Sequence, residues 1–134
     1  ALEGEWSFHR TVTLGMSMKG TATFERRSAH HLFYLEQGLI VETRIEFTRA
    51  YDYVIDGANL SVFYADGPDK GKRFLYFEGL ILKGFPFSGK ATHLCGKDHY
   101  AADFAFSSDT EFYTHYDVMG PNKLHGITTE YKKL

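Results

Sequence analysis

The sequence has one cysteine, Cys95, and no long apolar run. A single cysteine excludes an internal disulfide and is typical of a reducing compartment. No segment approaches the roughly 20 apolar residues of a membrane-spanning helix, and the first residues do not resemble a signal peptide. A leader removed earlier would leave no trace. We therefore expect a cytoplasmic protein that does not enter a membrane.

Charge of one sign is also lacking. The 15 basic and 17 acidic residues leave a net charge of −2 and are scattered along the chain. The densest basic spots, Arg26-Arg27 and Lys70 to Arg73, fall in predicted turns, where charged side chains are ordinarily solvated. Binding to a phosphate backbone needs clustered positive charge, so we exclude nucleic acid as a partner.

Helix periodicity is nearly absent, whereas alternation with a period of two recurs along the chain. Trp6, Phe8, Arg10 and Val12, for example, share one face of an expected strand. The 12 Phe and 9 Tyr residues suit pleated sheets. These patterns predict an all-β protein with little or no helix.

Turn signals about every ten residues divide the chain into nine or ten antiparallel strands. Alternation specifies both faces of several strands, and closing the sheet removes its edges, so a closed barrel is favoured over a sandwich. We expect residues 1–134 to form a single barrel domain. The predicted strands lie near residues 6–13, 20–24, 31–43, 46–55, 59–64, 73–82 (with a bend near Gly79), 88–95, 98–106, 111–118 and 123–132.

Gly4-Glu5-Trp6 resembles the Gly-x-Trp signature of the lipocalins. In that family the Trp on the first strand closes the barrel floor and stacks under a basic side chain from the last strand. The resemblance implies that Lys132 or Lys133 supplies this cation, where the lipocalin pattern has Arg.

Nearly the full length resembles a family of uncharacterised, mostly bacterial lipocalin-like domains. The resemblance implies a calycin-type barrel, and the family has no established activity to carry over. It rests on Trp6 with Arg10, Gly20-x-Ala22-x-Phe24, Tyr34-x-Glu36-x-Gly38, Arg49-x-Tyr51, Phe63 with Asp66-Gly67, His93-x-Cys95, Asp98-x-Tyr100 and Gly120-Pro121-x-Lys123.

Several charged residues fall on strand faces that should point into the barrel. Burying a charge is costly unless it is paired, and the inward faces of a barrel converge, so such residues suggest a lined cavity. The candidate ligand-binding residues are Arg10, Tyr34, Glu36, Arg49, Tyr51, His93, Tyr100 and Lys123.

The leading hypothesis is a barrel that binds a small, partly aromatic, anionic molecule at its open end. Arg49 and Arg10 would bind the anionic group, because a guanidinium offers a planar fork to carboxylate or phosphate. The tyrosines would stack against the ligand or hydrogen-bond it. Alternatively, Glu36 pairs with one of these arginines as a buried structural bridge capped by tyrosine hydroxyls.

Two other classes stay open. An enzyme, such as an acid/base lyase, decarboxylase or isomerase, would use Glu36 or His93 as general acid/base, with Arg49 and Tyr51 orienting the substrate and stabilising charge. Phenolic acid decarboxylases have a similar barrel and use the same residue types. A filled barrel would instead serve as an interaction module. No catalytic residue is assigned, and the oligomeric state is left open, a dimer being one option.

The seven histidines raise the question of a metal or haem. His30 and His31 are adjacent and look like turn residues, and His93 with Cys95 falls short of the three or four ligands that zinc requires. Haem binding of the nitrobindin type would need one inward histidine, His93 or His125. Our prediction is no metal and no cofactor, with haem as a further alternative.

Overall fold

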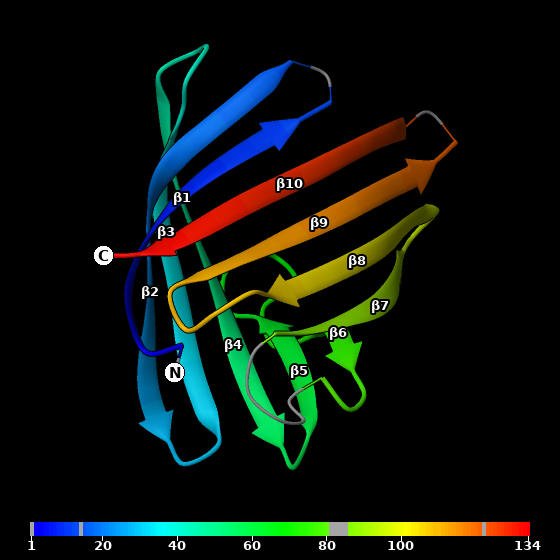
Figure 1. The fold of residues 1–134 in the computed structure, drawn as a ribbon. Helices are drawn as coiled ribbons and strands as arrows, with labels where there is room; N and C mark the ends of the chain where they lie inside the picture. The colour runs from blue at the N-terminus through cyan, green and yellow to red at the C-terminus, as the bar shows by residue number, and fades with distance from the viewer. Residues whose placement is uncertain (1, 14, 81–85, 122) are drawn as a thin grey trace.

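The computed structural model describes residues 2–13, 15–80, 86–121 and 123–134, without the side chains of Phe87, Cys95 and Lys123. Ten strands make up the described fold, and no described residue is helical (Figure 1). In this part of the chain no helix is long and apolar enough to cross a membrane. The strands are β1 (Gly4–Val12), β2 (Met16–Ser28), β3 (His31–Ile40), β4 (Ile45–Asp56), β5 (Asn59–Tyr64), β6 (Arg73–Phe77), β7 (Phe87–Cys95), β8 (Asp98–Phe106), β9 (Glu111–Gly120) and β10 (Lys123–Lys133).

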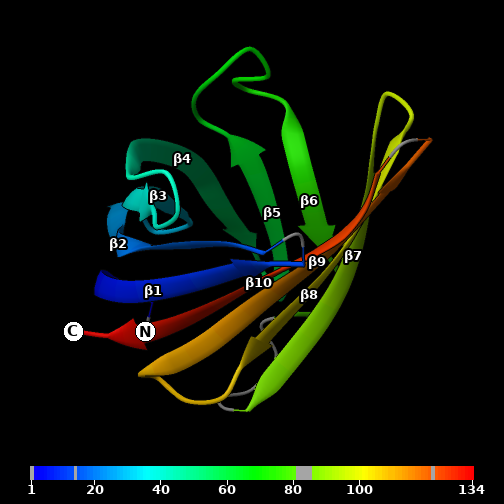
Figure 2. The same ribbon diagram turned by 90° about the horizontal axis from the view of Figure 1, so that it is seen from above.

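All ten strands belong to one antiparallel sheet, in the order β6-β5-β4-β3-β2-β1-β10-β9-β8-β7. The first and last strands pair along their length, with Trp6 opposite Lys133 and Val12 opposite Ile127. The sheet curls into a nearly closed barrel, which confirms the predicted fold class (Figure 2).

The outermost strands β6 and β7 approach each other through side chains. A Cβ added to Gly89 on β7 would lie 2.5 Å from Leu80 Cδ1 and 3.4 Å from Phe77 Cδ1, so these side chains pack directly onto the glycine. The predicted strand 73–82 is too long, since β6 ends at Phe77 and the chain turns at Gly79, whose φ is 68°. Positions 81 and 82 lie outside the described residues.

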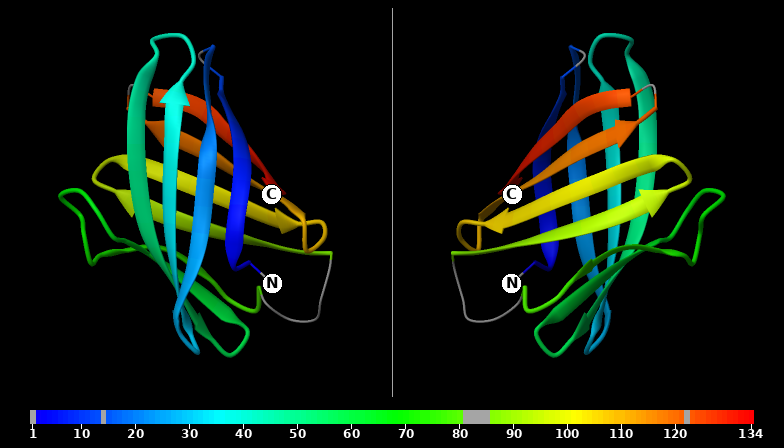
Figure 3. Two further views of the ribbon diagram at one scale, coloured as in Figure 1. Left: turned by 90° about the vertical axis from the view of Figure 1, so that its left-hand side faces the viewer. Right: turned by 90° about the vertical axis from the view of Figure 1, so that its right-hand side faces the viewer.

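The predicted strand 31–43 is also too long. β3 ends at Ile40, whose carbonyl accepts a hydrogen bond from Arg44 N–H at 2.8 Å. Arg44 has a φ of 59°, so the chain reverses where alternation alone suggested extension. Figure 3 shows the β3–β4 turn at one end of the barrel and the β2–β3 and β4–β5 turns at the other.

One end of the barrel is closed by Trp6, which is 1% exposed. Its ring meets Phe112 edge-on at a centroid distance of 4.9 Å, and its indole N–H donates to the Leu2 carbonyl at 2.9 Å. The Lys133 ammonium lies 5.2 Å from the ring centroid, within reach of a cation–π interaction. Of the two lysines considered for this role, Lys133 fills it.

Two glycines let neighbouring strands of the wall approach each other closely. Gly20 on β2 pairs with Gly38 on β3. A Cβ on Gly20 would lie 2.1 Å from the Gln37 carbonyl oxygen, and one on Gly38 would lie 2.7 Å from Phe47 Cζ. The two strands therefore approach each other more closely than a side chain permits.

Gly20→Ala is expected to lower the free energy of unfolding by about 1–3 kcal/mol, because the backbone must move to admit a methyl group. Chemical denaturation of the variant tests this. Thr23→Ala, on the exposed outer face of the same strand, is the control and should leave stability nearly unchanged. Equal stability of the two variants would show that the close approach carries no constraint.

Candidate functional site

A cavity of about 330 Å³ lies inside the barrel. Its wall includes Val12 and Ile127, which pair at the end of β1 remote from Trp6, so the cavity opens at the end opposite the floor. Six of the eight predicted residues line it, namely Arg10, Tyr34, Glu36, Arg49, Tyr51 and Tyr100. The sequence therefore placed most of its candidate residues around one space.

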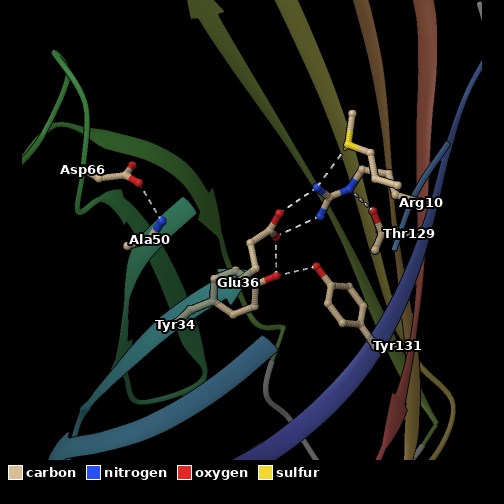
Figure 4. Close-up of polar contacts among 8 residues, drawn as sticks. Arg10, Tyr34, Glu36, Ala50, Asp66, Thr129 and Tyr131 are labelled. Carbon is tan, nitrogen blue, oxygen red and sulfur yellow. Dashed lines mark hydrogen bonds and ion pairs between the residues drawn. The ribbon is translucent and has the colours of Figure 1, made fainter. Parts of the chain in front are cut away.

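An ion pair crosses the interior between β1 and β3 (Figure 4). The Arg10 guanidinium donates to both oxygens of Glu36, at 2.7 and 2.9 Å, and through Nε to Thr129 Oγ1 at 2.8 Å. The Tyr34 hydroxyl donates to Glu36 Oε1 at 2.6 Å and lies 2.9 Å from the Tyr131 hydroxyl. Glu36 is 1% exposed, and both its oxygens have partners. The buried structural bridge that the sequence allowed is therefore present, with Arg10 as its cation.

This network fixes the charges of its members. Burial raises the pKa of Glu36, but the hydrogen bonds and charge of Arg10 outweigh it, so the pKa is lowered overall. Burial also disfavours the charged form of Arg10 and so lowers its pKa, but the hydrogen bonds to Glu36 more than reverse that effect. Burial, with the neighbouring Tyr131 and Glu36, raises the pKa of Tyr34. A charged pair capped by a neutral phenol results.

Burial raises the pKa of Tyr131 to about 12, against 10 for an exposed tyrosine, while Arg10 opposes the rise. Between these values an unfolded chain loses a proton that the folded chain keeps. The contribution of Tyr131 to stability is therefore fully present below about pH 10 and is lost as the pH rises toward about 12. We expect Tyr131→Phe to lose less stability than wild type over that interval, as measured by urea unfolding.

Tyr113→Phe is the matched control for this titration, because Tyr113 is 43% exposed on the outer face of β9. It should keep the wild-type dependence on pH. An unchanged slope in Tyr131→Phe would mean that Tyr131 ionises as easily in the folded chain as in the unfolded one.

Arg49 is the charged residue of the cavity wall that has no ion-pair partner in this network. It lies opposite Glu36 across β3 and β4, yet no carboxylate of the described residues lies within ion-pair distance of it. The Tyr51 phenol, followed by the charge of Glu36, raises the pKa of Arg49. The side chain is exposed and borders the cavity, so it carries a positive charge at the mouth.

Aromatic rings form the wall beside Arg49. Phe74 stacks between Tyr51 and Tyr116, with interplanar angles of 19° and 17° and centroid distances of 5.9 and 5.8 Å. Tyr100 meets Phe74 edge-on at 5.8 Å. All four residues line the cavity, so it presents ring surfaces to whatever it contains.

A second hollow of about 280 Å³ adjoins the mouth. It shares Arg49, Tyr51, Phe74 and Tyr100 with the cavity and adds residues of the β5–β6 turn, including Asp66. Asp66 accepts a hydrogen bond from the Ala50 N–H at 3.0 Å, which ties the turn to β4 (Figure 4). Arg49 therefore stands where the inner cavity meets the outer hollow.

The other two predicted residues are placed differently. His93 does not line the cavity; its ring packs against Phe74 at 5.3 Å and Tyr100 at 6.1 Å, just outside the wall. Burial lowers the pKa of His93, and the charge of Asp69 opposes this. The backbone of Lys123 begins β10, and its side chain lies outside the described residues.

Metal-binding clusters are absent from the part of the chain that the structure describes, where no three His, Cys, Asp or Glu residues converge. His30 lies in the β2–β3 turn, whereas His31, expected in that turn, begins β3 and places Nε2 2.6 Å from Asp52 Oδ1. The side chain of Cys95 is outside the described residues.

Sequence reasoning missed several members of the wall, namely Met18, Phe74, Thr114, Tyr116 and Tyr131, and also Thr129, which accepts a hydrogen bond from Arg10. Alternation gave a usable signal for some of them, since Thr129 and Tyr131 share a strand face, as do Thr114 and Tyr116. Neutral hydroxyl groups drew less attention than buried charges, and the bulge between β5 and β6 obscured the inward direction of Phe74.

Residues 2–133 match the family described as DUF6314, a family of unknown function. The chain belongs to the DUF6314 family. No curated protein matches it.

Solved structures similar to this DUF6314 barrel include EF1p2_mFAP2b bound to DFHBI, with a TM-score of 0.58 and 14% identity over 99% of this chain and 94% of that one. A redesigned β-barrel, mFAP1, bound to DFHBI has a TM-score of 0.56 and 15% identity over 98% and 94%. A de novo designed fluorescence-activating barrel has a TM-score of 0.53 and 9% identity over 98% and 93%. At these identities the similarity concerns the fold alone.

Proposed function

We propose that the barrel binds a small, partly aromatic, anionic molecule in the cavity at its open end. Arg49 receives the anionic group, and the rings of Tyr51, Phe74, Tyr100 and Tyr116 contact the ligand body. The Arg10–Glu36 pair lines the cavity and links β1 to β3 across β2.

The observation that carries this proposal is the different use of two arginines on one cavity wall. Arg10 is satisfied by Glu36 and Thr129, whereas Arg49 has no carboxylate partner among the described residues. A guanidinium beside low-dielectric aromatic walls attracts an anion more strongly than one in open water, and its planar fork fits a carboxylate. An anionic ligand would complete the pairing that the described residues leave open.

Cavity size limits the ligand. A volume of about 330 Å³ is near the lower end of the range of about 300–1,000 Å³ usual for small-molecule pockets. Aromatic walls favour a planar body, since ring pairs gain stability beyond simple burial. Two of the similar barrels hold the small molecule DFHBI, which supports ligand binding inside this fold. We extend the proposal to a lipocalin-like, calycin-type barrel acting in the cytoplasm.

The environment of Glu36 favours a binding protein over an enzyme. A general base must reach the proton that it removes, and Glu36 is 1% exposed with its oxygens occupied by Arg10 and Tyr34. Its lowered pKa also makes it a weak base. The residue is better suited to holding Arg10 than to exchanging protons with a substrate.

Native mass spectrometry of freshly purified protein tests the proposal. We expect a population carrying one additional small mass, which collisional activation releases as a negative ion. If only the unliganded mass appears, both after purification and after incubation with a metabolite extract, the proposed function is wrong.

A further inference from the structure

Three hydroxyl groups inside the cavity have no hydrogen-bond partner among the described residues. They belong to Tyr53 on β4 and to Thr114 and Tyr116 on β9, and all three residues line the cavity. Tyr53 is 7% and Thr114 is 4% exposed, so neither side chain reaches bulk water in the way that a surface hydroxyl does.

These hydroxyls border empty space and are not sealed in the protein. Every side-chain nitrogen or oxygen that is fully sealed in the described part of the chain has a hydrogen-bond partner. The three hydroxyls fall outside that class, so they face the cavity itself. Buried polar groups are nearly always satisfied, and an occupant of the cavity would satisfy these.

The three groups are suited to a neutral partner. Burial raises the pKa values of Tyr53 and Tyr116 well above the ordinary range for tyrosine, and the Tyr53 phenol raises the pKa of Tyr116 further. Both therefore keep their protons and, like Thr114, can donate one hydrogen bond and accept others. Such groups match a hydroxyl or carbonyl group better than a second charge.

Tyr53, one of the three, lies apart from Arg49. Tyr53 lies four residues beyond Arg49 on the inward face of β4, which is about 13 Å farther along the strand toward the closed end. Arg49 is exposed at the mouth, whereas Tyr53 packs against Phe24 near the floor, with ring centroids 5.1 Å apart. The cavity thus has a cationic outer end and, at Tyr53, a neutral hydroxyl toward its closed end, and the hydroxyls of Thr114 and Tyr116 also line it.

From this arrangement we infer that the ligand is bipolar: a planar ring compound with an acid group at one end and a neutral hydrogen-bonding substituent, a hydroxyl or carbonyl, at the other. The acid meets Arg49, and the neutral substituent enters first and meets Tyr53, Thr114 and Tyr116. This inference rests on the proposed function and specifies the ligand class of the same site.

The test uses acids that differ only at the inner end, measured by isothermal titration calorimetry. The pairs are para-hydroxycinnamate with para-methylcinnamate, and para-hydroxyphenylacetate with para-methylphenylacetate, which offer two lengths. We expect at least one hydroxy acid to bind about 10-fold or more tightly than its methyl partner, because the methyl group leaves the cavity hydroxyls unsatisfied.

Variants assign the preference to these residues. Thr114→Val and Tyr53→Phe should each reduce the preference for the hydroxy acid severalfold while leaving the affinity for the methyl acid unchanged or higher. Because neither variant loses a hydrogen bond within the protein, both should unfold at the wild-type denaturant concentration. Tyr113→Phe, on the outer face, should keep the wild-type preference.

The possible outcomes separate the two proposals. If the acids bind but hydroxy and methyl partners have equal affinity at both lengths, the inference is overturned and the proposed function stands. A preference that survives in both Thr114→Val and Tyr53→Phe also overturns it. If no acid of either pair binds, the proposed function and the inference both fail.

Discussion

Glu36→Leu is expected to lower the free energy of unfolding by about 3–5 kcal/mol, the usual cost of removing one partner of a buried ion pair. The substitution leaves the Arg10 guanidinium, whose side chain is 12% exposed, without its carboxylate. It also removes the acceptor of the Tyr34 hydroxyl. Urea or guanidinium unfolding monitored by tyrosine and tryptophan fluorescence measures the loss.

The double variant Arg10→Met with Glu36→Leu is the informative control. Replacing both partners by apolar residues of similar volume is often neutral or stabilising, so the double variant should regain most of the stability lost by Glu36→Leu. A double-mutant cycle converts this recovery into a coupling energy. If Glu36→Leu alone is as stable as wild type, the pair does not hold the barrel wall as we describe.

Arg49→Gln is expected to weaken the binding of an aromatic carboxylate by about 10- to 100-fold. A hydrogen bond to a charged group contributes about 1.5–3 kcal/mol, and every 1.4 kcal/mol corresponds to a factor of ten in affinity. The variant keeps a donor at the mouth but removes the charge and the planar fork. Calorimetric titration with cinnamate gives the dissociation constants.

Arg73→Gln matches this change in charge at a position that does not line the cavity. Arg73 begins β6, is exposed and lies over the Tyr76 ring at 4.9 Å. Its substitution should leave cinnamate affinity within about twofold, and both variants should keep wild-type stability, as exposed substitutions usually do. Equal loss of affinity in the two variants would indicate a general effect of net charge, and no loss in Arg49→Gln would remove the residue from the site.

Much of the fold followed from local pattern. Period-two alternation and turn residues placed ten strands, because each strand of a barrel must present one face to the interior and one to water. Asn59–Tyr64 and Asp98–Phe106 matched the prediction to the residue. The failures were at strand ends, because alternation carries no information about φ: the reversal at Arg44 was missed, and β6 ends at Phe77, before the predicted bend at Gly79.

The sequence allowed us to predict which strand faces line the candidate site, but not which side chains contact each other there. Sequence reasoning allowed Glu36 to pair with Arg10 or with Arg49, which lies opposite it on the adjacent strand. The structure selects Arg10, from a strand two places away in the sheet. The choice between these partners is a tertiary contact across the barrel, about which the pattern along each strand carries no information.

The central claim is that the cavity selects an anionic aromatic molecule through Arg49. Calorimetric titration of wild-type protein with cinnamate and with its uncharged amide, cinnamamide, tests this most directly, because the two differ little in shape. We predict saturable one-to-one binding of cinnamate, at least about 10-fold tighter than that of the amide. Equal affinities, or tighter binding of the amide, would contradict the account.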